Sequence, residues 1–290
     1  MKVLVIGATG MLGYSLFSNL SDYKHLDVFG TVRSIKKKEV FFKNRISKLF
    51  TNININDTNG IERTMNYLKP DIVLNCIGLI KQHDISKQHI SAITVNALFP
   101  HQLANICDNN GSKLIHFSTD CVFDGTIGNY KENDLPTATD LYGKSKCLGE
   151  INYGRHITLR TSIIGHELST SVSLIDWFLS QEKCVDGFSK AIFSGLPTCY
   201  IAKILAELIF TNPKLKGMYH LSVDSIDKFS LLTLVAESYK KRITINNNTS
   251  FSINRSLNST NFRNLTGFVP PKWYELVEYM HNDYIKRYIL

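Results

Sequence analysis

The residues best suited to chemistry lie in Leu141-Tyr-Gly-Lys-Ser-Lys146, where the phenol of Tyr142 is followed four residues later by the ammonium of Lys146. A hydroxyl, Thr119, lies upstream in Ser118-Thr-Asp-Cys-Val-Phe-Asp-Gly125. If the segment from Tyr142 to about Tyr153 is helical, residues four apart share a face, so the Lys146 charge favours the tyrosinate and eases proton donation to a carbonyl. An isolated pair with this spacing also fits a solvated helix face, so the assignment depends on the elements around it.

A glycine-rich turn at the amino terminus supplies that context. The apolar run Lys2-Val-Leu-Val-Ile6 predicts a strand, followed by Gly7-Ala-Thr-Gly-Met-Leu-Gly13 and an amphipathic stretch from Met11 to Leu20. Gly7 permits a tight turn, Gly10 lets backbone amides approach a pyrophosphate, and Gly13 lets the helix pack close to the strand. The trio alone also fits a surface loop, but its position between strand and helix favours dinucleotide binding, with cofactor contacts expected from Gly7, Thr9, Gly10, Met11, Leu12 and Gly13.

Strand-like and helix-like segments alternate through the first half of the chain. Apolar strands are predicted at residues 2–6, 27–32, 49–55, 71–75, 113–118 and 156–160. This alternation indicates right-handed crossovers and an α/β fold, a Rossmann-type doubly wound parallel sheet. Ligands bind such sheets at the carboxyl edge, where we expect Gly7, Asn75, Thr119 and Tyr142 to converge.

The later part of the chain is expected to form a smaller, partly interleaved C-terminal substrate domain. We assign residues 1–165 to NAD(P) binding and residues 166–290 to substrate binding. Helices are predicted at Ser173–Gln181 and Tyr200–Phe210 and a strand at Gly217–Leu221, whereas the polar stretch Asn246–Ser252 is interpreted as a surface loop.

These motifs together resemble the extended short-chain dehydrogenase/reductase family, and within it the dTDP-4-dehydrorhamnose reductase subgroup. The resemblance spans most of the chain and rests on five segments in the family's order: Gly7–Gly13, Ser118–Gly125, Tyr142–Lys146, Arg160-Thr-Ser162 and Pro197-Thr198. It implies that Thr119 orients the substrate carbonyl, that Tyr142 supplies the proton, and that Lys146 holds the nicotinamide ribose and lowers the tyrosine pKa.

The resemblance also implies further cofactor contacts at Asn75, Gly78 and Ser118, and a supporting role for Asn96. Asn75 is equally well interpreted as a strand-end turn, and Asn96 as a satisfied helix amide. Substrate contacts are implied at Lys81, Thr119, Asp120, Val122 and Arg255. Arg255 lies in a segment similar to the family's Arg-Pro-Leu-Asn, with Ser256 in place of proline; it is a candidate for the substrate diphosphate or for a surface ion pair.

The implied reaction is NADPH-dependent reduction of the C4 ketone of a nucleotide-linked 4-keto-6-deoxyhexose, which would supply a deoxysugar for surface polysaccharide. Two departures leave the sugar open, including one with a 2-acetamido group: Cys121 stands where the subgroup often has tyrosine, and Ser162-Ile-Ile-Gly165 replaces an aromatic stretch. Two alternatives share the scaffold: a nucleotide-sugar epimerase with tightly bound NAD, and a non-catalytic dinucleotide-binding subunit that regulates a partner.

The choice of cofactor depends on the residue after the second predicted strand. An acidic residue there would bind a ribose 2′-hydroxyl, but this strand runs into Arg33 and a lysine-rich stretch. A guanidinium can make a forked contact to a 2′-phosphate, so we predict NADPH, with NADH possible; a solvated basic loop is the alternative. Asn54, near the end of the third strand, can hydrogen-bond the adenine.

Composition fits an enzyme with one large α/β core. The chain has 290 residues, 43% of them hydrophobic, and a formal net charge of +8 from 33 basic and 25 acidic side chains. The basic residues are scattered and no nucleic-acid motif appears, so the excess either attracts nucleotide phosphates or reflects lysine-rich composition.

Six widely spaced cysteines form no metal or redox motif, so we expect reduced thiols and no metal. No secretory signal or membrane-spanning run is visible. We therefore expect a cytoplasmic protein with a nucleotide-sugar substrate, no nucleic-acid or membrane partner, and a homodimer as one possible assembly.

Overall fold

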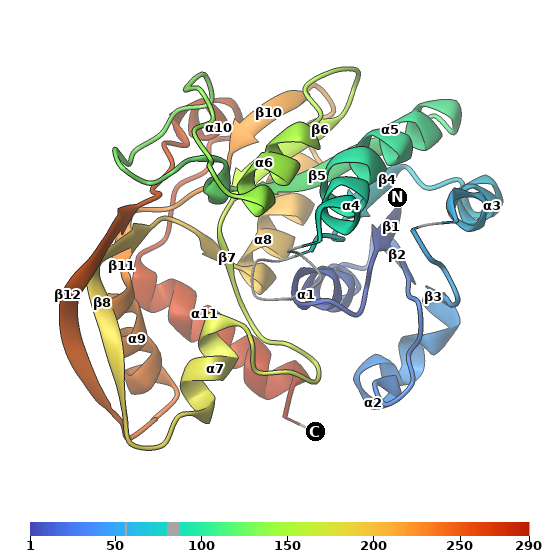
Figure 1. The fold of residues 1–290 in the computed structure, drawn as a ribbon. Helices are drawn as coiled ribbons and strands as arrows, with labels where there is room; N and C mark the ends of the chain where they lie inside the picture. The colour runs from blue at the N-terminus through green and yellow to red at the C-terminus, as the bar shows by residue number, and fades with distance from the viewer. Residues whose placement is uncertain (56, 80–87, 290) are drawn as a thin grey trace.

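The main sheet of this computed structural model joins strands from both parts of the chain. The structure describes residues 1–55, 57–79 and 88–289. Among these residues the sheet has seven strands, all parallel, in the order β10 (Gly217–His220), β6 (Ile157–Thr161), β5 (Lys113–Thr119), β4 (Ile72–Asn75), β1 (Lys2–Ile6), β2 (Asp27–Thr31) and β3 (Leu49–Phe50). The Rossmann-type fold predicted from the sequence is confirmed (Figure 1).

Helices cover both faces of this sheet because its strands are apolar on both sides. Successive side chains of β1 point to opposite faces, so Val3 and Val5 enter one core while Leu4 and Ile6 enter the other. The first core is completed by α1 (Met11–Leu20), α8 (Thr198–Ile204) and α11 (Trp273–Arg287), and the second by α3 (Thr58–Leu68) and α5 (Phe99–Asn109).

Shorter elements connect the sheet to its helices. They are α2 (Glu39–Phe42), α4 (His89–Ala92), α6 (Leu141–Leu148), the 3-10 helices η1 (Lys43–Lys48) and η4 (Asp120–Val122), and the π-helices η3 (Ile93–Leu98) and η5 (Leu205–Ile209). Two predicted boundaries were too long: the third strand pairs only at Leu49–Phe50, and the helix that begins near Tyr142 ends at Leu148. Gly149 follows that helix and packs so closely on the Asn96 carbonyl that a Cβ would clash.

The remaining elements form a second layer beside the main sheet. A three-stranded sheet has the order β11 (Ile226–Asp227), β8 (Cys184–Phe193) and β12 (Thr244–Asn254), and α9 (Lys228–Ser238) packs against it. The other elements are α7 (Leu174–Ser180), α10 (Thr260–Thr266) and the paired strands β7 (Ile163–Ile164) and β9 (Leu196–Pro197). The strand predicted at Gly217–Leu221 does not belong to this layer; as β10 it extends the main sheet beside β6.

The prediction of a surface loop at Asn246–Ser252 is wrong, because these residues lie within β12. This strand pairs in parallel with β8, with a register shift between Asn248 and Ser252. Most of its side chains are exposed on both faces, so the segment lacks the apolar alternation that marks a half-buried strand. Within the described part of the chain, every helix is too short or too polar to span a lipid bilayer.

Candidate active site

The end of β5 and the start of α6 bring the predicted hydroxyl and phenol together. Thr119 is the last residue of β5, and its side-chain oxygen accepts a hydrogen bond from the Cys121 amide (3.1 Å). Asp140 caps α6 by accepting from the Gly143 amide (2.9 Å), and Gly143 packs on the Cys121 carbonyl so closely that a Cβ would clash. The first turn of α6 is therefore fixed against the loop that follows Thr119.

Tyr142 is held as a neutral phenol. Burial is the largest influence on its pKa and raises it well above the ordinary value, with the nearby Cys121 thiol acting in the same direction. A hydrogen bond with Thr119 opposes this shift only in part. Because the phenol keeps its proton at neutral pH, Tyr142 can act as an acid toward an oxygen bound beside Thr119.

The Lys146 side chain is bound to the backbone of β5 in this structure, and its effect on the Tyr142 pKa stays a prediction. The Lys146 ammonium donates to the Phe117 carbonyl oxygen (2.6 Å), which directs it along β5. Burial lowers the pKa of Lys146 to about 8, while the Glu150 carboxylate acts to raise it. The pKa of Tyr142 is raised, chiefly by burial.

A π-helix positions the backbone beside Lys146. Asn96 lies in η3 and is almost fully buried; its amide oxygen accepts from the Leu79 amide (2.9 Å) and its amide nitrogen donates to the Leu79 carbonyl (3.2 Å) and to Ser145 Oγ (3.2 Å). Gly78 is exposed, and a Cβ built on it would lie 3.9 Å from Lys146 Nζ. Asn96 therefore connects α6 to the segment after β4, where Gly78 exposes its backbone near the lysine.

The glycine turn has the geometry needed for close approach of a ligand to the backbone. Gly7 has a φ of 88°, which favours glycine, and a Cβ on Gly13 would clash with the Gly7 carbonyl. Gly10 is exposed and forms the N-cap of α1 without a side-chain hydrogen bond, and no acidic residue lies in the first helical turn. The first amides of α1 thus face the turn without a side-chain acceptor.

Two predicted cofactor residues use their side chains inside the protein. Asn75 is 1% exposed; it lies 3.1 Å from the His116 ring nitrogen and accepts from the Ile77 amide (3.1 Å). Ser118 donates to Glu150 (2.6 Å), whose carboxylate binds Arg160 through two bonds of 2.7 Å. In this structure both side chains shape the strand ends, so only their backbones are left for a cofactor.

Arg33 lies exposed immediately beyond β2 and Val32. Burial lowers the pKa of Lys38, and the nearby positive charge of Arg33 lowers it further, so two cations face this edge of the sheet. Asn54 is exposed farther along the same edge, after β3. The loop therefore offers positive charge where an adenosine phosphate would lie in a Rossmann fold.

The C-terminal layer contributes a lysine that we did not predict. Lys228, the first residue of α9, places its ammonium 3.8 Å from the centre of the Phe193 ring, and burial lowers its pKa to about 8. The charge of Asp120 acts to raise the pKa of Lys228, which shows that the two groups are close. The printed sequence offers no signal for this lysine, because only the packing of β8 and α9 brings it to β5.

Arg255 lies near the Asp120 carboxylate, as Lys228 does. Burial raises the pKa of the Asp120 carboxyl, while Arg255 and Lys228 act to lower it. Arg255 Nε donates to the Phe123 carbonyl (2.9 Å), and Nη1 lies 3.6 Å from Cys121 Sγ. Asp120, Lys228 and Arg255 form a charged wall next to Thr119.

The two remaining substrate predictions have different outcomes. Val122 is fully buried in a small core with Phe123, Tyr130 and Leu257, so its side chain is closed to a substrate in this structure. Lys81 lies outside the described residues.

Comparison with known proteins identifies a family model and several relatives that are similar to this chain. A family model described as RmlD substrate binding domain matches residues 1–285. Methionine adenosyltransferase 2 subunit beta from Danio rerio is 25% identical, over 82% of this chain and 74% of that protein. A probable low-salt glycan biosynthesis reductase, Agl14, from Haloferax volcanii is 32% identical, over 52% of this chain and 48% of that protein.

A solved structure shares the fold. The crystal structure of dTDP-4-dehydrorhamnose reductase from Bacillus anthracis in complex with NADP superposes with a TM-score of 0.79 and 21% identity. The match covers 97% of this chain and 99% of that chain, so it includes the main sheet and the C-terminal layer alike.

Proposed function

The chain belongs to the RmlD substrate binding domain family, and on that premise we propose that it is an NADPH-dependent reductase of a nucleotide-linked 4-keto-6-deoxyhexose. The reaction converts the C4 ketone to an alcohol. The observation that carries this proposal is the neutral phenol of Tyr142, hydrogen-bonded to Thr119 at the carboxyl edge of a dinucleotide-type sheet.

The residues of the glycine turn fit a dinucleotide. A pyrophosphate needs backbone amides and a surface without Cβ atoms, and the turn from Gly7 to Gly13 provides both. Thr9, Met11 and Leu12 belong to the same turn and would contribute through their backbone. Arg33, with Lys38 nearby, supports a preference for the 2′-phosphate of NADPH, and Asn54 would contact the adenine.

Side chains of the protein would donate the proton and orient the ketone. When bound, NADPH supplies the hydride that adds to C4. Thr119 would hold the ketone oxygen and Tyr142 would donate its proton to that oxygen as negative charge develops there. Lys146 would exchange its bond to the Phe117 carbonyl for the nicotinamide ribose, close to the exposed backbone of Gly78.

The charged wall supports a nucleotide-sugar substrate. Arg255 and Lys228 are cations that can bind diphosphate or carbonyl oxygens, and Asp120 can accept hydrogen bonds from sugar hydroxyls. A dTDP-linked sugar and a UDP-linked 2-acetamido-2,6-dideoxy-4-hexulose are both compatible, and either product would serve surface polysaccharide synthesis.

A second candidate function follows from the curated relatives named as subunit beta of methionine adenosyltransferase 2. A chain of this kind would bind a dinucleotide and regulate a catalytic partner without reducing a sugar itself. The neutral phenol of Tyr142 beside Thr119 favours the reductase, because a binding subunit has no need of a proton donor at the sheet edge.

The test is an NADPH oxidation screen with the purified chain alone. The panel would contain 4-keto-6-deoxy nucleotide sugars with thymidine or uridine, with and without a 2-acetamido group, and NMR would identify the product. We expect consumption of one NADPH per 4-hydroxy sugar formed with at least one member. Binding of NADPH without turnover on the whole panel would favour the regulatory subunit.

A further inference from the structure

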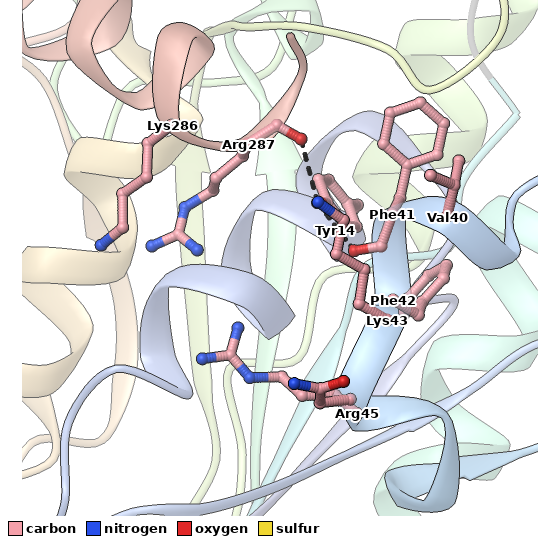
Figure 2. Close-up of a pocket in the computed structure, with 9 residues that line it drawn as sticks. Tyr14, Val40, Phe41, Phe42, Lys43, Arg45, Lys286 and Arg287 are labelled. Atoms are coloured by element: carbon pink, nitrogen blue, oxygen red, sulfur yellow. Dashed lines mark hydrogen bonds between the residues drawn. The ribbon is translucent and has the colours of Figure 1, made fainter. Parts of the chain in front are cut away.

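A pocket of about 260 Å³ lies between α1, the segment α2–η1 and the end of α11. Four cationic residues line it: Lys43, Arg45, Lys286 and Arg287. Figure 2 shows the charged ends of Arg45, Lys286 and Arg287 gathered at one end of the pocket, with the ring of Phe41 at the other. Its volume is below the roughly 300–1,000 Å³ of pockets for drug-sized ligands, so it suits a smaller molecule.

The walls of this pocket are held together by hydrogen bonds. The Tyr14 hydroxyl lies 3.1 Å from the Phe41 carbonyl and 3.5 Å from the Arg287 carbonyl, so one phenol ties α2 to the end of α11 (Figure 2). The Arg287 side chain is 7% exposed, and its guanidinium is fixed by Asp283 (2.7 Å) and Asp22 (2.6 Å). The pocket therefore has a buried, oriented cation at its base.

Positive charge exceeds negative charge around this space. The Asp22 carboxylate contacts three of the cations, Arg45 at 2.9 Å, Lys286 at 2.7 Å and Arg287 at 2.6 Å. Burial acts to raise the Asp22 pKa, but hydrogen bonds from Lys286 and Arg287 outweigh it and lower the pKa to about 2. Among the described residues, Asp22 and Asp283 are the carboxylates paired with these cations, and together they neutralise two of the four charges.

Lys43 lines the pocket and is exposed, and the ion pairs of the Asp22 carboxylate involve Arg45, Lys286 and Arg287 rather than Lys43. Three cations that share the Asp22 carboxylate, and a fourth, exposed one, line this half-open pocket. Such a set favours an anion with several oxygens, because that group can accept hydrogen bonds from all of them at once. We propose that this pocket is a binding site for a small phosphate-bearing ligand, separate from the dinucleotide crevice.

The pocket and the glycine turn contact different parts of α1. Gly10 caps the amino end of α1, whereas the pocket contacts begin at Tyr14 and continue to Asp22, beyond the other end of the helix. Residues four apart share a face of a helix, so Tyr14 and Ser18 lie on the same face of α1. The Ser18 carbonyl oxygen lies 3.5 Å from Arg45 Nη1, so this face is directed toward η1. Arg33, the proposed contact for the cofactor phosphate, does not line this pocket.

Calorimetric titration of the full chain with inorganic phosphate, at constant ionic strength, tests this proposal. We expect saturable binding of one phosphate that persists when NADP⁺ saturates the cofactor crevice. The double variant Lys43→Met, Lys286→Met should weaken phosphate binding at least tenfold, since both side chains are exposed and their replacement leaves the core intact. The matched control is Lys190→Met, Lys214→Met, which removes two exposed lysines elsewhere.

Three results would overturn the proposal. Binding that NADP⁺ abolishes would assign the phosphate to the cofactor crevice. Equal weakening in the control pair would indicate a general charge effect, and unchanged affinity in the Lys43, Lys286 variant would remove these residues from the site. The single variant Lys43→Met repeats the test without touching the Asp22 cluster, and it should by itself lower the affinity by a few fold.

Discussion

The two walls of the candidate active site are built by different means. The wall from the first half of the chain consists of strand ends, a glycine turn and a capped helix, so backbone geometry places Gly10, Thr119 and Tyr142. The wall from the second half places Lys228 and Arg255 through the packing of segments far apart in sequence. Local backbone structure can be predicted from sequence patterns. The position of Lys228 and Arg255 depends on tertiary contacts, which such patterns do not show.

The variant with the largest expected effect on turnover removes the proton donor from the first wall. Tyr142→Phe should lower turnover by about two orders of magnitude or more while leaving NADPH affinity little changed, because only the transferred proton is lost. Steady-state NADPH oxidation and a fluorescence titration of the cofactor would measure the two quantities. Tyr67→Phe, at an 81% exposed tyrosine, is the control and should behave as the unaltered chain.

Arg33→Asp tests the cofactor end of the same wall. Loss of a charge-assisted bond to the 2′-phosphate, worth roughly 1.5–3 kcal/mol, should shift the ratio of kcat/KM for NADPH over NADH by about tenfold or more. Lys36→Asp changes an exposed charge in the same loop and should shift that ratio much less. An unchanged ratio in the Arg33 variant would leave cofactor choice without an explanation at this residue.

Lys228→Met tests the second wall by itself. Its removal should raise the KM for the nucleotide sugar by about tenfold, which corresponds to roughly 1.4 kcal/mol, with no effect on NADPH binding. Lys190→Met, at an exposed position of β8, should leave both quantities unchanged. A parallel loss of cofactor affinity in the Lys228 variant would show that the two walls do not work separately.

A smaller effect is expected on the free energy of unfolding, which should depend on pH through Lys146. Its folded-state pKa of about 8 lies below the 10.5 of a free lysine, so the buried charge opposes folding and its full cost is present below pH 8. Between pH 8 and 10.5 the folded chain has lost this proton while the unfolded chain keeps it, and the cost disappears as pH rises. Urea unfolding should therefore show Lys146→Met gaining stability relative to the unaltered chain at pH 7, with the gain shrinking by pH 10; a gain that does not change with pH would contradict the shifted pKa.

Much of the first wall could be predicted from the sequence. The start of β1, the limits of α1 and the order of the following strands agree with periodicity and glycine spacing, because these elements are stabilised by local rules. The contact between Lys146 and the Phe117 carbonyl could not be predicted, since it depends on how α6 crosses β5.

Of the second wall, sequence reasoning named Arg255 but missed Lys228 and the strand β12. β12 escaped prediction because its pairing with β8 uses the backbone, while its asparagine-rich side chains remain exposed. The place of β10 in the main sheet depends on a long crossover that composition does not reveal. Lys228 is one lysine among many until folding sets it beside Asp120.

The measurement that tests the central claim most directly is transfer of deuterium from NADPH labelled at the reactive carbon. We expect the purified chain to place one deuterium at C4 of the sugar for each cofactor oxidised, and the Tyr142→Phe variant to do so at least about a hundredfold more slowly. A sugar product without deuterium, formed while NADPH remains unoxidised, would contradict the reductase and indicate an epimerase. Tight NADPH binding without any sugar product would contradict it in favour of a regulatory subunit.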